Sequence, residues 1–309
     1  MASRLARRHF APLAVAASAA WLGPWARKVS CEAKSEAIPS RFRTSLYRLD
    51  ENLWKAGQAL RPGMVTTRFK PGRTHVIRIV LTGGPCAGKS SALEHLTRAA
   101  TAAGYDVYAA PEVCTVLLNA GMQFPEPGCA GYEDRWLAIQ TGVMQMQLQL
   151  ERSMTDIAAS TGRPSIIIFD RGLLDGRAYV PAHNWAKLVG QVEASAAGLD
   201  KPRKLISEEY MLARYNMIVH LTSAADGAEE YYKWGKTVDD SGHAVIRGEP
   251  PEKARELDHK LRDCWRQHPR WVLIHNGPDG FKGKLQRATD SIMKLASEIH
   301  PQGPKNGQV

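Results

Sequence analysis

A glycine-rich segment between a strand pattern and a helix pattern constrains the fold of this 309-residue chain more than any other feature. Residues 83–90 read GGPCAGKS and match G-x-x-x-x-G-K-[ST] at every required position. The run HVIRIVL precedes them, and a helical pattern begins at about Lys89. A strand, a glycine loop and a helix N-terminus direct backbone N–H groups toward phosphate oxygens. We therefore predict that this turn binds the phosphates of a nucleotide.

Two side chains of this loop have specific predicted roles. Lys89 can reach the β- and γ-phosphates, and the Ser90 hydroxyl can bind Mg²⁺. The predicted ligand is ATP or GTP together with Mg²⁺. The sequence leaves the choice of base open, because it contains no Asn/Thr-Lys-x-Asp motif of the kind that often recognises guanine. The predicted nucleotide-binding residues are Gly83, Gly84, Pro85, Cys86, Ala87, Gly88, Lys89, Ser90 and Ser91.

Strand and helix patterns alternate from residue 74 onward. Runs typical of strands occupy residues 75–81, 105–110, 165–169, 216–221 and 271–275, and helical patterns occupy about 89–103 and 133–160. The longer helix carries one apolar stripe, made of Trp136, Ile139, Val143, Met146, Leu150, Met154 and Ile157. This alternation predicts a three-layer α/β fold of the P-loop NTPase, nucleotide-kinase-like type, with a mainly parallel five-stranded sheet. We assign this domain to residues 74–300 and a tail to residues 301–309.

Polar residues follow two of the predicted strands, at the edge where open parallel sheets bind ligands. Asp170 ends the run SIIIF, and Arg171 follows it. We predict that Asp170 binds Mg²⁺ or its water shell and that Arg171 contacts phosphate, a surface turn being the alternative. Glu112 follows the second strand and can accept the proton of an acceptor hydroxyl. A helix N-terminal acid favoured by the dipole is the alternative for Glu112.

Residues 224–255 form a polar, glycine-containing stretch with several cations. A mobile lid that carries a cation onto the γ-phosphate has this composition, and so has an ordinary exposed loop. Arg247 is the strongest candidate for the lid cation.

The first thirty residues carry five basic residues and no acid. Such an Ala-rich, acid-free segment predicts organelle targeting, to mitochondria or alternatively to plastids. A secretory signal or membrane anchor through residues 11–25 is a further alternative, although this stretch is shorter than the roughly 20 residues of a spanning helix. Residues 31–73 are predicted to be a basic linker, or alternatively a segment that docks on a membrane surface or a partner.

Charge and cysteine usage exclude several classes of protein. Half of the formal charge of +10 lies in residues 1–30, and the remaining Lys and Arg residues are dispersed among acids. This distribution argues against a nucleic-acid partner and suits anions such as nucleotides or phospholipid headgroups. The five cysteines show no CxxC pair and no metal-ligand spacing, so neither a disulfide framework nor a metal site of cysteines is expected.

Several segments together resemble one known family. They are LTGGPCAGKSSAL, PEV, FDRGLLDGRAY, YNMIVHLTSAADGAEEYY and ARELDHKLRDCWRQHP, followed by LIHNG. Over about residues 76–298 they resemble the NadR/TRPL-translocation-defect-type AAA domain family. The resemblance implies a kinase-type P-loop fold rather than a hexameric ring. One branch of that family is similar to a ribosylnicotinamide kinase domain, and the other includes a trafficking protein that binds GTP and phosphoinositides.

Two functions follow as expectations. The first is a Mg²⁺-dependent phosphotransferase, similar to a small-molecule kinase, that uses ATP or GTP and an unknown small-molecule acceptor. The second is a GTP- or ATP-dependent regulatory switch that binds phosphoinositide membranes or a trafficking partner. A mechanical ATPase is least expected, because no Asp-Glu pair closes the third strand.

Overall fold

The computed structural model describes residues 76–196, 206–232, 234–238, 244–247, 249–301, 303 and 304. All of them lie in a unit that spans Asp50–Val309. The predicted targeting segment 1–30 and the predicted basic linker 31–73 lie outside the described residues. None of the helices in the described part of the chain is long and apolar enough to cross a membrane.

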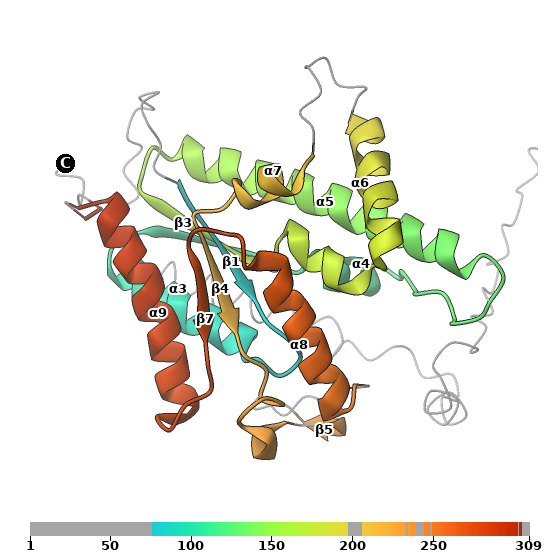
Figure 1. The fold of residues 1–309 in the computed structure, drawn as a ribbon. Coiled ribbons are helices and arrows are strands. Elements are labelled where there is room, and N and C mark those ends of the chain that lie inside the picture. The colour runs from blue at the N-terminus through green and yellow to red at the C-terminus, as the bar shows by residue number, and fades with distance from the viewer. Residues whose placement is uncertain are drawn as a thin grey trace, which may run out of the picture. The chain divides into compact units, whose positions relative to one another are not determined.

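The five predicted strand runs form one parallel sheet (Figure 1). The strands are β1 (Val76–Thr82), β2 (Asp106–Ala110), β3 (Ser165–Asp170), β4 (Met217–Leu221) and β7 (Trp271–Ile274). Their order is β2-β3-β1-β4-β7, so β1 lies in the middle. The register pairs Leu81 with Asp170 and Thr82 with His220. Because parallel strands end at one edge, the loop after β1 lies among the ends of its neighbours.

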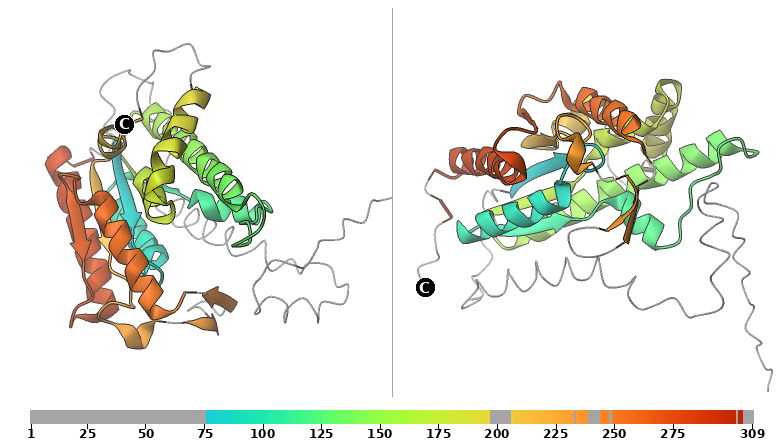
Figure 2. Two further views of the ribbon diagram at one scale, coloured as in Figure 1. Left: turned by 45° about the vertical axis from the view of Figure 1, so that its right-hand side comes forward. Right: turned by 90° about the horizontal axis from the view of Figure 1, so that it is seen from below.

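Helices cover both faces of this sheet, which confirms the predicted three-layer α/β fold. One face packs against α3 (Lys89–Ala102) and α9 (Gly280–Ile299). The other face packs against α5 (Tyr132–Ser160), α6 (Ala182–Ala196) and α8 (Pro251–Trp265). Figure 2 shows α5 and α6 on the side of the sheet away from α9. The described residues also form α4 (Val113–Asn119), the 3₁₀ helix η2 (Leu173–Tyr179) and α7 (Glu208–Leu212).

The strand sequences explain this arrangement. Successive side chains of a strand point to opposite faces of a sheet. Accordingly Ile77, Ile79 and Leu81 of β1 belong to the core beneath α3 and α9, whereas Val80 belongs to the core beneath α5, α6 and α8. A strand buried on both faces reads as a continuous apolar run, and β3 does so.

The predicted apolar stripe of α5 is not its buried face. Met146 and Ile157 of that stripe are exposed, and its other members are only partly buried. The buried face is rotated away and includes polar side chains: Leu137, Gln140, Thr141, Met144, Gln147, Glu151 and Ala158. The reason is a buried hydrogen-bond network around Glu151, which takes the place of apolar packing along the middle of the helix.

Residues 224–255 contain regular elements, which the sequence patterns did not predict. The 3₁₀ helix η3 (Glu229–Tyr231) leads to β5 (Gly235–Val238) and β6 (Ala244–Arg247), which pair antiparallel. Helix α8 then begins at Pro251, a residue suited to the first helical position. The polar composition that suggested a lid or a loop therefore includes a short two-stranded hairpin and the first turns of α8.

Candidate functional site

The loop of residues 83–90 connects β1 to α3 through backbone that requires glycine. Gly83 has φ 141° and Gly88 has φ 85°. A Cβ at Gly83 would lie 2.1 Å from the carbonyl oxygen of Leu221, and a Cβ at Gly84 would lie 2.9 Å from Cβ of Asp258. Any side chain at these two positions would displace neighbouring residues. The glycines of the motif are thus explained by close packing as well as by conformation.

Lys89 is the first residue of α3, and its ammonium turns back over the loop. Its Nζ lies 3.4 Å from the carbonyl oxygen of Gly83, to which it donates. Burial lowers the pKa of Lys89, nearby Arg171 lowers it further, and Asp170 opposes them. Ser90 is exposed on the next position of the helix. A lysine and a helix N-terminus at one loop favour an anion there.

Glu112 and Arg171 were predicted as site residues that follow two different strands, and they form an ion pair in the structure. Arg171 has φ 71°, and its Nε donates to Oε1 of Glu112 at 2.5 Å. The other carboxylate oxygen of Glu112 accepts a hydrogen bond of 2.6 Å from the Thr115 hydroxyl. Burial raises the pKa of Glu112, but the charge and hydrogen bond of Arg171, the hydrogen bond from Thr115 and the charge of Lys89 together outweigh burial, and the pKa is lowered. Glu112 is therefore an ionised carboxylate whose two oxygens are both engaged.

Asp170 ends β3 beside Leu81, at the base of the loop. Its Oδ1 is buried and has no hydrogen-bond partner among the described residues. Burial raises the pKa of Asp170, and the charge of Lys89 opposes that effect. Buried polar atoms are normally paired, so this oxygen requires an explanation. A hard cation that prefers oxygen ligands would supply the missing partner, and the site therefore fits Mg²⁺.

Two buried aspartates hold the loop and its neighbours, and sequence reasoning missed both. Oδ1 of Asp258 accepts hydrogen bonds from the backbone N–H groups of Gly84 at 2.7 Å and Ser223 at 3.3 Å. Oδ1 of Asp175 accepts from the Thr82 hydroxyl at 2.5 Å, and its Oδ2 accepts from the N–H of Gly172 at 2.7 Å.

A signal for Asp258 exists in the sequence. The buried face of α8 contains Ala254, Asp258, Leu261 and Trp265, at helical spacing. A single acid within an otherwise apolar helical stripe indicates a buried carboxylate that needs donors.

Arg247 is the last residue of β6 and pairs with Gly235 across the hairpin. Its predicted contact with phosphate remains a prediction.

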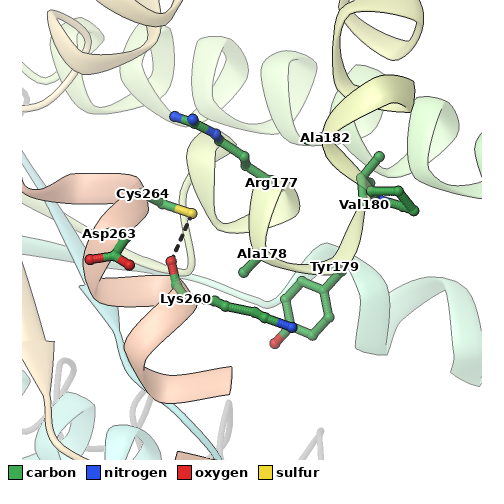
Figure 3. Close-up of a pocket in the computed structure, with 9 residues that line it drawn as sticks. Arg177, Ala178, Tyr179, Val180, Ala182, Lys260, Asp263 and Cys264 are labelled. Carbon is green, nitrogen blue, oxygen red and sulfur yellow. Dashed lines mark hydrogen bonds between the residues drawn. The ribbon is translucent and has the colours of Figure 1, made fainter. Parts of the chain in front are cut away.

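A surface groove lies between η2 with the residues that follow it and α8 (Figure 3). It has a volume of about 480 Å³, within the range of roughly 300–1,000 Å³ that small-molecule sites occupy. The lining residues come from two segments. The end of η2 and the residues after it contribute Arg177, Ala178, Tyr179, Val180, Pro181 and Ala182, and α8 contributes Lys260, Asp263 and Cys264.

Tyr179 joins this groove to the ion pair. Cζ of Arg171 lies 5.7 Å from the centroid of the Tyr179 ring. Burial raises the pKa of Tyr179 to about 12, so its phenol is protonated at neutral pH. Figure 3 shows the Lys260 side chain extending toward the same ring. A molecule in the groove that contacts Tyr179 would thus lie near Arg171.

The chain matches a known protein family. Residues 78–280 match the family described as "AAA domain". No curated protein matches the chain. One similar solved structure is the "Crystal structure of NadR protein in complex with NAD and AMP-PNP", with 12% sequence identity and a TM-score of 0.43. The similarity covers 72% of this chain and 50% of that chain, so this chain matches half of that protein's length.

Proposed function

This chain belongs to the AAA domain family matched over residues 78–280, and from that premise we propose that it is a Mg²⁺-dependent phosphotransferase. It would move the γ-phosphate of ATP or GTP to a small-molecule acceptor. The observation that carries this proposal is the convergence of Lys89, Asp170 and Arg171 at one loop, with buried polar atoms that lack partners among the described residues. Phosphoryl transfer depends mainly on positioning and on charge stabilisation, which such a cluster provides.

The residues would divide the work as follows. The N–H groups of the loop and the Lys89 ammonium would bind the phosphates. Asp170 and the exposed Ser90 hydroxyl would hold Mg²⁺, which supplies neutralisation of the phosphate charge when bound. Arg171 would contact a phosphate oxygen through its buried NH1, which has no hydrogen-bond partner in the described part of the chain.

Glu112 would act first by orienting Arg171. Its oxygens accept from Arg171 Nε and from Thr115, so a proton from the acceptor would meet a carboxylate that is already engaged. A loose phosphoryl-transfer transition state makes little demand on a base. The predicted role of Glu112 as proton acceptor therefore stays secondary to its orienting role in this proposal.

The groove beside Tyr179 is the proposed acceptor site. Its lining residue Tyr179 has its ring centroid 5.7 Å from Cζ of Arg171, and Arg177 and Lys260 bring positive charge to the lining. The protonated Tyr179 phenol can donate a hydrogen bond to an acceptor hydroxyl or carbonyl.

The test is Mg²⁺-dependent phosphate release and transfer by the full chain, with ATP and GTP offered separately. A panel of nucleosides, nucleotides and nicotinamide riboside serves as acceptors, and Lys89→Ala is the control. We expect turnover that rises with one acceptor and falls on the order of 100-fold or more in Lys89→Ala. Unchanged nucleotide affinity and turnover in that variant would contradict the phosphate site itself.

The regulatory switch is the other outcome of the same test. Tight, Lys89-dependent binding of ATP or GTP without stimulation by any acceptor would exclude the phosphotransferase. Binding to vesicles containing phosphoinositides, with and without nucleotide, would then decide whether the chain is a membrane-binding switch.

A further inference from the structure

Phe281 presents a large aromatic ring beside the glycine loop. It is the second residue of α9, and 49% of its surface is exposed. A Cβ at Gly88 would lie 2.5 Å from Cε2 and 2.8 Å from Cζ of this ring. The ring therefore lies against the backbone of Gly88, directly before Lys89. Single exposed apolar residues are common on protein surfaces, so the contact with the loop is the informative feature.

The segment that carries Phe281 is firmly anchored by a buried lysine one turn farther along α9. Lys284 is 2% exposed, and its Nζ donates to the carbonyl oxygen of Thr222 at 2.5 Å and to Oδ1 of Asn276 at 2.9 Å. The Asn276 side chain in turn donates to the carbonyl oxygens of Ser223 and Asp226, both at 2.8 Å. The loops after β4 and β7 are thus joined into one frame.

The same frame is bonded to the glycine loop. The Ser223 hydroxyl donates to the carbonyl oxygen of Pro85 at 2.5 Å, and the N–H of Ala224 donates to the carbonyl oxygen of Cys86 at 3.3 Å. Phe281 is consequently held at a fixed place relative to the loop. A rigid aromatic ring loses little conformational freedom when a ligand packs on it.

A nucleotide with its phosphates on this loop must direct its ribose and base away from the loop. Every nucleobase has a π-face that stacks on aromatic side chains. We propose that Phe281 is the surface on which the base of the bound nucleoside triphosphate stacks. The inference rests on the nucleotide binding in the proposed function and adds a residue that recognises the nucleoside rather than the phosphates. Stacking alone does not distinguish adenine from guanine, so Phe281 would serve ATP and GTP alike.

The experiment compares ligands with and without a base on the full chain. Calorimetric Kd values of MgATP, MgGTP and inorganic Mg-tripolyphosphate are measured for the wild type, Phe281→Ala and Phe281→Tyr. We expect Phe281→Ala to raise the Kd of the nucleotide that the wild type binds by about tenfold, which is the effect of losing one base–aromatic stack. Its affinity for tripolyphosphate should stay unchanged, and Phe281→Tyr should bind nucleotide like the wild type.

Ile157→Ala is the matched control, because Ile157 is an apolar residue on α5 with 52% exposure. It should change neither affinity, and thermal unfolding checks that each variant folds. Equal weakening of nucleotide and tripolyphosphate by Phe281→Ala would overturn the proposal, since the ring would then only support the loop. Unchanged nucleotide affinity would overturn it as well. A wild type that binds tripolyphosphate but neither nucleotide, or none of the three, would contradict the proposed function together with this inference.

Discussion

Two glutamate–arginine pairs of similar geometry lie in different surroundings. At the carboxyl edge of the sheet, Arg171 Nε lies 2.5 Å from Oε1 of Glu112. Within the helical layer, Arg214 Nε lies 2.7 Å from Oε2 of Glu151. The Glu112 side chain is 28% exposed, whereas that of Glu151 is 2% exposed. The distance alone therefore does not distinguish the two pairs.

The hydrogen bonds around each pair do separate them. Oε1 of Glu151 accepts from the Tyr215 hydroxyl at 2.6 Å and from Gln147 Nε2 at 3.0 Å. At the sheet edge, by contrast, Asp170 Oδ1 and Arg171 NH1 are buried without partners among the described residues. A satisfied network stabilises a fold, and an unsatisfied one leaves donors and acceptors for a ligand.

The hydrogen-bond network around Glu151 also supports the backbone around Arg171. Gln147 Nε2 lies 3.3 Å from the carbonyl oxygen of Arg171, and the N–H of Leu173 donates to the Tyr215 hydroxyl at 2.9 Å. The backbone on both sides of Gly172 is thereby fixed from within. We infer that the Glu151 network is the scaffold that holds Arg171 in its left-handed conformation.

The largest expected effect is on stability, from Glu151→Ala. Removing one partner of a buried pair leaves the other charge uncompensated and costs about 3–5 kcal/mol. Glu151 raises the pKa of Arg214 against the effect of burial, which lowers it, so the arginine depends on this acid. Urea unfolding measures the loss. The double variant Glu151→Met with Arg214→Met should recover most of the lost stability. If Glu151→Ala alone left the free energy of unfolding nearly unchanged, the scaffold role of Glu151 would be contradicted.

The next largest effect is expected for Asp170→Asn, at the carboxyl edge of the sheet, and it concerns turnover. A change at the proposed Mg²⁺ site should lower Mg²⁺-dependent turnover by about 100-fold. The midpoint of thermal unfolding without Mg²⁺ should not fall, because Asp170 Oδ1 forms no hydrogen bond that the variant could lose within the described residues. A large drop in that midpoint together with normal turnover would reverse the roles assigned to the two regions.

Glu112→Gln should have a smaller effect, of about tenfold on kcat, because a neutral amide orients Arg171 less strongly than a carboxylate does. The Kd of the nucleotide should stay unchanged. The folded pKa of Glu112 is lowered by Arg171, against the opposing effect of burial, so the pair contributes stability above the ordinary glutamate value of 4.5. That contribution should disappear as the pH falls through the lowered pKa. The stability difference between wild type and Glu112→Gln should therefore vanish in acid, and a pH-independent difference would contradict the ionised state of Glu112.

The sequence predicted the sheet, its parallel strands and the phosphate loop, because these depend on local pattern. Runs such as SIIIF specify a strand buried on both faces whatever surrounds them. The buried face of α5 could not be predicted in this way. Its position depends on Arg214 and Tyr215, which lie 63 and 64 residues from Glu151 along the chain. The contact of Asp258 with Gly84 spans 174 residues and is equally non-local.

The smallest effect concerns the groove and uses two lysines of α8 that both pair with Glu256. Lys253 Nζ lies 3.0 Å and Lys260 Nζ 2.9 Å from its carboxylate, but only Lys260 lines the groove. Lys253→Ala and Lys260→Ala thus lose equivalent surface ion pairs, and their stabilities should change alike. If the groove binds the acceptor, Lys260→Ala alone should raise the acceptor KM, by about threefold, the size of one exposed charge contact. The nucleotide Kd should stay constant in both variants. Equal acceptor KM values in the two variants would place the acceptor elsewhere, and the unsatisfied edge around Asp170 and Arg171 would then need another route by which the acceptor enters.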